Sequence, residues 1–264
     1  MKKLTIREII QATGAQMIAL GDMEQCLNRI ISHVTTDSRE VKKGSLFVAV
    51  KGETRDGHDF IPQCFEQHKG IACFSEKVMV PAGDGILLLV KDTRQAFLDL
   101  AKYYRDQFDI PFIGITGSVG KTSTKDMVAS VVSQRYDTLW TQGNFNNDLG
   151  VPMTLFRLEE HHQAAVIEMG MNHAGEIDRL AKVVRPDIGI ISNVGVAHIE
   201  YLGSRADRPT AAFSVTKTGK NLTDRQGPAV SVTKTGKNVA EHRKAGSKSL
   251  LTRPLFSWRF RCIL

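Results

Sequence analysis

The segment 112–124 restricts the fold of this chain more than any other part of the sequence. It contains an apolar run, a turn with Gly117 and Gly120, the pair Lys121 and Thr122, and then a stretch of helical period. Glycines permit a tight turn in which backbone N–H groups converge on a phosphate at a helix N-terminus. A lysine and a threonine at these positions can reach the β- and γ-phosphates and a Mg²⁺ ion, respectively. The order of strand, loop and helix therefore predicts a phosphate-binding loop in a parallel α/β fold.

This loop departs from the strict phosphate-loop pattern at one position. The strict pattern has a glycine where Ile115 stands, and the nearest glycine, Gly114, comes one residue too early. The alternative interpretation is a glycine turn that leads into an ordinary helix. Agreement of the strand, loop and helix signals favours binding of a nucleotide phosphate.

The rest of the chain up to about residue 202 alternates short apolar runs with segments of helical period, as parallel α/β domains do. Thr5 and Glu8 have capping-box spacing, and Asp92 can cap a helix that buries an apolar face. The expected strands are 46–50, 70–74, 86–90, 112–115, 164–168 and 188–192. We expect a small N-terminal α/β domain (1–85), a connecting helix (86–110), an incomplete parallel-sheet domain with the phosphate loop (111–205) and an irregular tail (206–264).

The net charge of +7 would favour a nucleic-acid partner if it were spread over the chain. Residues 206–264, however, hold 12 basic and 3 acidic residues, which leaves residues 1–205 slightly acidic. The tail also repeats Ser214–Asn221 without change at Ser231–Asn238, and two copies are too few for a repeat fold. We expect a disordered, basic tail of foreign origin, with nucleic-acid binding by the tail as a less favoured alternative.

The spacing of the cysteines and the hydropathy of the chain indicate in which cellular compartment the protein is located. The four cysteines form no CxxC pair, and no apolar run reaches the roughly 20 residues that cross a bilayer. We therefore expect reduced thiols, no membrane span and a cytoplasmic location.

The phosphate loop and several other sequence blocks resemble the Mur ligases of bacterial cell-wall synthesis. The blocks that carry the resemblance are Thr36-Asp-Ser-Arg39, Gly44–Ala49, Lys51-Gly-Glu53, Asp56–Phe60, Thr116–Thr122, Gly143–Pro152, Glu168-Met-Gly-Met171 and Asn193–Ile199. The resemblance covers about residues 1–205. It implies a UDP-sugar-binding N-terminal domain followed by an ATPase domain.

The resemblance further implies an ATP- and Mg²⁺-dependent ligase of peptidoglycan precursor synthesis. Such an enzyme adds D-alanyl-D-alanine to UDP-N-acetylmuramoyl-tripeptide through an acyl phosphate, and we expect it to act as a monomer without nucleic acid. By resemblance, Lys121, Glu168 and His198 are catalytic, and Thr122, Glu168 and His198 hold the metal. The implied nucleotide contacts are Thr116, Gly117, Ser118, Val119, Gly120, Lys121, Thr122 and Ser123, and the implied substrate contacts are Ser38, Arg39, Asn144 and Asn147.

Each of these residues has a structural alternative. Glu168 could be a solvated carboxylate at a strand end, and His198 a loop or core histidine. The asparagines 144, 146 and 147 beside Gly143 are also expected as polar turn formers. Ser38 and Arg39 could belong to a turn, although an arginine fork suits a pyrophosphate. His58 could face substrate or cap the helix that follows it.

Two features of the family have no counterpart here. The first lysine after His198 is Lys217, inside the repeat, so no carbamylated metal-binding lysine is carried over. The 59 residues after Arg205 do not resemble the family's C-terminal domain, which binds the amino substrate. We therefore expect a truncated chain with impaired turnover, and the alternative function is a nucleotide- or UDP-sugar-binding remnant without ligase activity.

Overall fold

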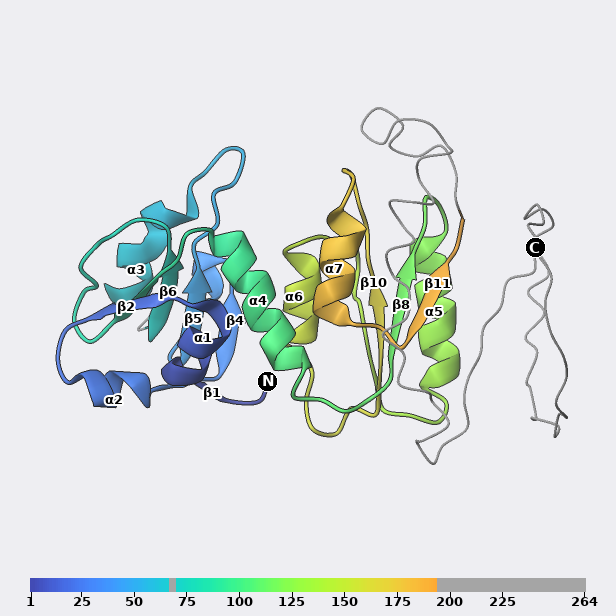
Figure 1. The fold of residues 1–264 in the computed structure, drawn as a ribbon, viewed down its shortest axis with the longest axis horizontal. Helices are drawn as coiled ribbons and strands as arrows, with labels where there is room; N and C mark the ends of the chain where they lie inside the picture. The colour runs from blue at the N-terminus through green and yellow to red at the C-terminus, as the bar shows by residue number, and fades with distance from the viewer. Residues whose placement is uncertain (67–69, 194–264) are drawn as a thin grey trace, which may run out of the picture. The chain divides into compact units, whose positions relative to one another are not determined.

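The computed structural model describes residues 1–66 and 70–193 of the chain (Figure 1). All of them belong to the first of two units, Met1–Lys217. His198 and the tail 206–264 lie outside the described residues, so the expectations for them stay predictions. No helix in the described ranges is long and apolar enough to span a membrane. Cys26, Cys64 and Cys73 are buried free thiols.

The first half of the described chain is built on a five-stranded sheet in the order β2-β7-β6-β5-β4. Its strands from β4 to β7 are parallel, and β2 runs antiparallel to β7 at one edge. Strands buried on both faces read as continuous apolar runs, which is why β5, β6 and β7 can be recognised in the sequence. The bounds are β2 (Gln16–Ala19), β4 (His33–Thr35), β5 (Ser45–Val48), β6 (Ala72–Ser75) and β7 (Ile86–Leu89).

Short elements surround this sheet. The expected capping box is present, because the Thr5 side chain accepts from the Glu8 N–H while the Glu8 carboxylate accepts from the Thr5 N–H. The helix that it starts ends at Gly14, which is left-handed with φ 66°. The bounds are β1 (Leu4–Thr5), α1 (Ile6–Thr13), α2 (Met23–Leu27), β3 (Ile30–Ile31), the 3₁₀ turns η1 (Ser38–Glu40) and η2 (Gly57–Phe60), and α3 (Ile61–Glu66).

Helix α4 (Thr93–Arg105) follows the first sheet and begins at the expected cap, Asp92, whose carboxylate accepts from the Gln95 N–H. It contacts α1 as well as α6 and α7 of the second half. Strand β7 pairs with both β6 and β2, so the first sheet continues past the boundary that we placed at residue 85. The connecting segment thus starts after β7, because the apolar run 86–90 completes the sheet.

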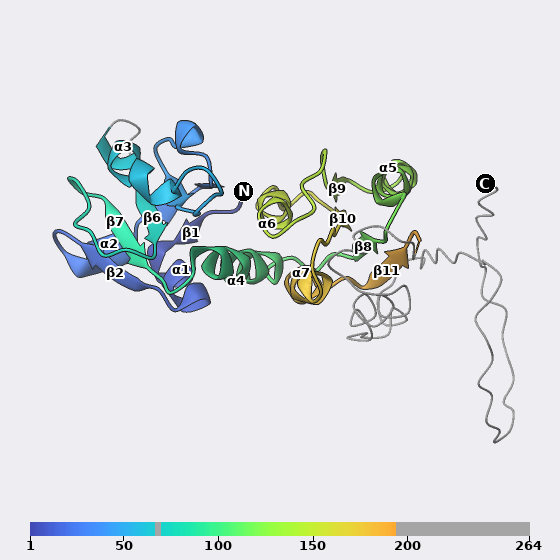
Figure 2. The ribbon, with the colours of Figure 1, turned by 90° about the horizontal axis from the view of Figure 1, so that it is seen from above.

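The second half holds an all-parallel sheet in the order β11-β8-β10-β9. Alternate residues of its strands face two different apolar clusters: Ile113, Ile115 and Val166 pack with α5, and Phe112, Ala165 and Ile167 pack with α4, α6 and α7. Figure 2 shows α5 and α7 on opposite sides of this sheet. The bounds are β8 (Phe112–Thr116), α5 (Lys121–Val132), β9 (Thr138–Trp140), α6 (Gly150–Leu155), β10 (Ala164–Glu168), α7 (Glu176–Val184) and β11 (Ile188–Ile191).

Candidate functional site

The predicted phosphate loop lies between the end of β8 at Thr116 and the start of α5 at Lys121. Gly117 has φ 140° and Gly120 has φ 82°, both conformations that side-chain-bearing residues rarely adopt. A Cβ on Gly117 would also lie 2.9 Å from the backbone N and O of Asn193. Both glycines are therefore required by the backbone of the loop itself.

The loop is fastened to the segment after β11. The Ser118 N–H donates to the Asn193 carbonyl at 2.8 Å, and the Ser192 hydroxyl donates to the Val119 carbonyl at 2.7 Å. The Ser118 amide, which we expected to contact nucleotide, thus has a protein partner in this structure. Ser192 was missed in the sequence because a serine after an apolar strand carries no specific signal.

Lys121 and Thr122 occupy the first two positions of α5, at the mouth of the loop. The Lys121 ammonium donates to the Gly117 carbonyl at 2.9 Å, which keeps it over the loop backbone. The Thr122 hydroxyl donates to Glu168 Oε1 at 3.3 Å. Ser123, the next residue, is exposed on the helix surface.

Glu168 ends β10, where the carboxyl ends of the parallel strands meet the phosphate loop. Its side chain is fully buried, which rules out the solvated alternative. Oε1 accepts from Thr122 and from the Asn146 side-chain amide at 2.8 Å, but Oε2 has no hydrogen-bond partner in the part of the chain that the structure describes. A buried, unpartnered carboxylate oxygen beside a threonine hydroxyl is a hard-oxygen donor set that fits Mg²⁺.

The three asparagines after Gly143 make different contacts from those that we expected. Asn146, which we did not assign to substrate, orients Glu168, and its own carbonyl accepts from the Gly170 N–H at 2.7 Å. The Asn147 side chain instead accepts from the N–H groups of Leu149 and Gly150, at the start of α6. Asn144 is exposed. Spacing alone could not tell which of three neighbouring asparagines turns inward.

The candidate UDP-sugar residues of the first half lie in η1. Arg39 is exposed and forms hydrogen bonds to both carboxylate oxygens of Asp37. These bonds from Arg39 lower the pKa of Asp37 to about 2. Ser38 begins the 3₁₀ turn next to them. The guanidinium is accessible to a ligand, which would compete with Asp37 for it.

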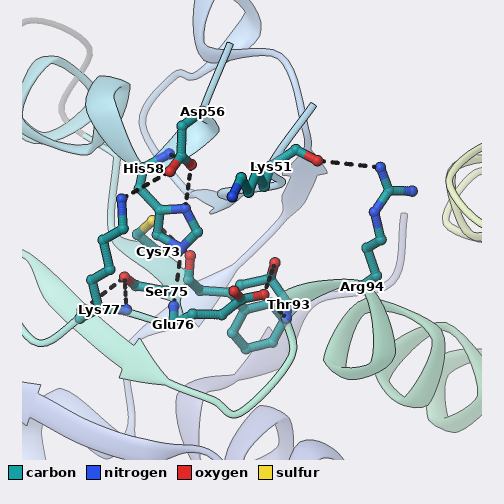
Figure 3. Close-up of polar contacts among 10 residues, drawn as sticks. Lys51, Asp56, His58, Cys73, Ser75, Glu76, Lys77, Thr93 and Arg94 are labelled. Atoms are coloured by element: carbon teal, nitrogen blue, oxygen red, sulfur yellow. Dashed lines mark hydrogen bonds and ion pairs between the residues drawn. The ribbon is translucent and has the colours of Figure 1, made fainter. Parts of the chain in front are cut away.

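His58 is a buried structural residue. Its Nδ1 lies 2.6 Å from Asp56 Oδ1, and its Nε2 accepts from the Glu76 N–H at 3.0 Å, so the proton is on Nδ1 (Figure 3). Hydrogen bonds from Lys77 and His58 hold the pKa of Asp56 below its usual range. Asp56 is the residue that caps η2, and both ring nitrogens of His58 have partners in the protein, so neither the capping nor the substrate-facing alternative fits. The ring instead connects η2 to the segment after β6.

Arg94 on α4 links loops from both halves. Its guanidinium forms an ion pair with Asp148 at 2.9 Å and donates to the Lys51 carbonyl at 3.4 Å; Figure 3 shows the second contact. Asp148 lies two residues after Asn146, the asparagine that bonds Glu168, whereas Lys51 belongs to the Lys-Gly-Glu block. No sequence motif singles out Arg94, because its two partners are 43 and 54 residues away in the chain.

Two other features lie away from the phosphate loop. A cavity of about 520 Å³ is lined by residues of β4 and α6 and contains none of the predicted site residues. Asp137, His161 and His162 place possible metal ligands within 4.8 Å of one another. In that group, however, His162 Nδ1 accepts from the Glu159 N–H, which puts the ring proton on Nε2 and leaves no free lone pair for a metal.

The fold and this site define a phosphate-loop α/β protein with a second parallel-sheet half before the loop. The family model described as the Mur ligase middle domain matches residues 115–223, and the one described as the Mur ligase family, catalytic domain matches residues 30–105. The chain belongs to the Mur ligase family. The first match extends beyond Arg205, where we expected the resemblance to stop.

The curated relatives that the chain matches include two ligases of the same name within this family. The chain is 44% identical over 203 residues to the UDP-N-acetylmuramoyl-tripeptide–D-alanyl-D-alanine ligase of Synechocystis, which covers 76% of this chain and 44% of the relative. It is 46% identical over 173 residues to the enzyme of the same name from Escherichia coli, with 66% and 38% covered. The chain thus spans less than half the length of these relatives.

Solved structures give the same family. The chain matches MurF from Acinetobacter baumannii with a TM-score of 0.73 and 37% identity, over 81% of this chain and 46% of that one. It matches MurF ligase from Thermotoga maritima, solved in complex with ADP, with a TM-score of 0.66 and 31% identity, over 71% of this chain and 43% of that one.

Proposed function

We propose that this chain forms the ATP-binding and UDP-sugar-binding parts of an ATP-dependent ligase. The ligase adds D-alanyl-D-alanine to UDP-N-acetylmuramoyl-tripeptide. The observation that carries this proposal is the meeting of the phosphate loop, through Thr122, with the buried and half-satisfied carboxylate of Glu168. The names of the similar ligases supply the substrates.

The chemistry requires two negatively charged groups to approach each other. The tripeptide carboxylate attacks the γ-phosphate of ATP, ADP leaves, and the amine of D-alanyl-D-alanine then displaces phosphate from the acyl phosphate to form the amide. Lys121, at the start of α5, offsets the charge of the phosphates, and the loop backbone holds them in line. When bound between Thr122 and Glu168, Mg²⁺ supplies further neutralisation of the phosphate charge.

The first half of the chain supplies the second nucleotide site in this proposal. Arg39 is exposed at the carboxyl end of β4 and offers a fork that suits the pyrophosphate of a UDP-sugar. Arg94 contacts the loop at Lys51 in the first half and Asp148 in the second half, two residues after the Asn146 that bonds Glu168. We further propose that the ligase acts in the cytoplasm as a monomer.

Calorimetric titration of ADP into the 264-residue chain in the presence of Mg²⁺ tests the phosphate-loop assignment. Removal of the Lys121 ammonium should weaken ADP binding by at least about tenfold in Lys121→Ala, because charge-assisted contacts to phosphate are lost. Lys182→Ala removes an exposed lysine on α7 and serves as the control. Equal affinity of Lys121→Ala and the unsubstituted chain would refute the proposal.

A further inference from the structure

Lys125 is a buried lysine that the proposed chemistry does not use. It lies on α5 on the same side as Lys121 and Thr122, since residues three and four apart share a helix face. Only 2% of the residue is exposed. Its ammonium donates to the Thr141 carbonyl at 2.9 Å and pairs with Asp126 at 2.7 Å. Lysines are almost never fully buried without such partners.

Thr141 connects this lysine to the site. It follows β9, is fully buried, and donates its own N–H to the Val166 carbonyl. Its hydroxyl accepts from the Glu168 N–H at 2.9 Å. Two hydrogen bonds therefore connect the Lys125 ammonium, through Thr141, to the backbone N–H of Glu168.

The cost of burying the Lys125 ammonium indicates that this residue does more than fill space in the core. Burial of an ammonium is costly, and a hydrophobic side chain of similar volume would fill the same space at equal or lower cost. What an aliphatic side chain could not do is hold the Thr141 carbonyl. The ammonium thus fixes the end of β9 against α5, and Thr141 in turn fixes the last residue of β10.

We propose that Lys125 is a positioning residue for Glu168 and acts through Thr141. Side-chain contacts from Thr122 and Asn146 hold Oε1, while the Lys125–Thr141 connection sets the backbone from which the carboxylate projects. Together they direct Oε2 to the metal position beside Thr122. This inference rests on the proposed function, because it concerns the metal that accompanies ATP.

The test compares ADP binding with and without Mg²⁺ in Lys125→Met, together with urea unfolding of the nucleotide-free protein. Loss of an outer partner of a metal ligand lowers metal affinity by about 10- to 100-fold, so the gain in ADP affinity that Mg²⁺ provides should fall by about that factor. ADP affinity without Mg²⁺ should not change. Lys125→Arg keeps a donor for Thr141 and should restore most of the gain.

Thr141→Val removes the acceptor for the Glu168 N–H and should cause the same selective loss. The double variant should lose no more than the worse single variant, because both changes break one connection. Lys182→Met, on the exposed face of α7, is the matched control and should behave as the unsubstituted chain.

Three results would overturn the inference. In folded Lys125→Met, Mg²⁺ could raise ADP affinity as much as in the unsubstituted chain, or ADP affinity could fall equally with and without Mg²⁺. In the double variant, the losses of the two single variants could add up. If Lys125→Met does not fold, Thr141→Val alone tests the inference. An unchanged increase in ADP affinity on addition of Mg²⁺ to that variant would then overturn it. Failure of the proposed function looks different, because Lys121→Ala would then bind Mg²⁺·ADP as tightly as the unsubstituted chain.

Discussion

Among single residues, Glu168 is the one whose buried carboxylate has hydrogen-bond partners on only one of its two oxygens. Oε1 has two donors, and Oε2 is buried without a partner among the described residues. Sequence reasoning singled out Glu168 because the block Glu168-Met-Gly-Met171, at the carboxyl end of an apolar run, resembles the Mur ligases. Sequence reasoning could not tell the roles of Asn144, Asn146 and Asn147 apart, because the inward orientation of Asn146 depends on contacts with Gly170, which is 24 residues away in the chain.

Glu168→Gln should therefore separate stability from metal binding. The amide oxygen can keep both bonds at the Oε1 position, and the buried charge is removed, but the NH₂ group then lies buried without an acceptor. The free energy of unfolding without Mg²⁺ should therefore change by no more than about 1 kcal/mol. Stabilisation of the protein by Mg²⁺·ADP should become smaller, because the carboxylate ligand is gone. Urea unfolding with and without Mg²⁺·ADP measures both effects. A variant that is less stable alone but keeps the full effect of Mg²⁺·ADP would contradict this account of the site.

Among the helices and strands, the strands that sequence reasoning found are mostly those buried on both faces; β11, which is only partly buried, is the exception. Strands β5, β6, β7, β8, β10 and β11 were all predicted, with ends within two residues of the observed ones. Strands β4 and β9 are three residues long, and β2 is only partly buried, so none of them gives a clear apolar run. Their pairing is decided by the neighbouring strands and not by their own residues.

The junction of β8 and α5 gives a prediction with an internal control. Gly117→Ala and Gly175→Ala both put a side chain at a positive φ, which costs about 1–2 kcal/mol. Only at Gly117 does the new Cβ also meet backbone, that of Asn193, whereas nothing lies within 4 Å at Gly175. Gly117→Ala should be the less stable variant in thermal unfolding and should lose ADP binding. Equal stability of the two variants would mean that the loop is not held against residues 192–193.

At the scale of the described unit, one apolar cluster runs from the first sheet through α4 to the second sheet. Tyr104 is buried in it, and its hydroxyl donates to the Leu158 carbonyl and accepts from the Lys2 N–H. Burial raises the pKa of Tyr104 to about 12. Sequence reasoning recognised α4 as a buried helix but treated 86–110 as a connection, because nothing local reveals that β7 completes the first sheet.

Tyr104→Phe tests whether this cluster unites the two sheets. Both hydrogen bonds would be lost at no change in apolar volume, so the free energy of unfolding should fall by about 1–3 kcal/mol. Because the cluster is continuous, urea unfolding should remain a single transition, with tyrosine fluorescence and circular dichroism changing together. Two separated transitions would show that the sheets unfold independently.

In the function that we propose, one chain holds two different nucleotide sites, one at the phosphate loop and one near Arg39. The most direct measurement is a calorimetric titration of UDP-N-acetylmuramoyl-tripeptide into the chain at saturating Mg²⁺·ADP, repeated with Arg39→Ala. The UDP-sugar should bind while ADP stays bound, and Arg39→Ala should weaken this binding without altering the affinity for ADP. Displacement of one nucleotide by the other would contradict the account, because it would mean that both compete for a single site.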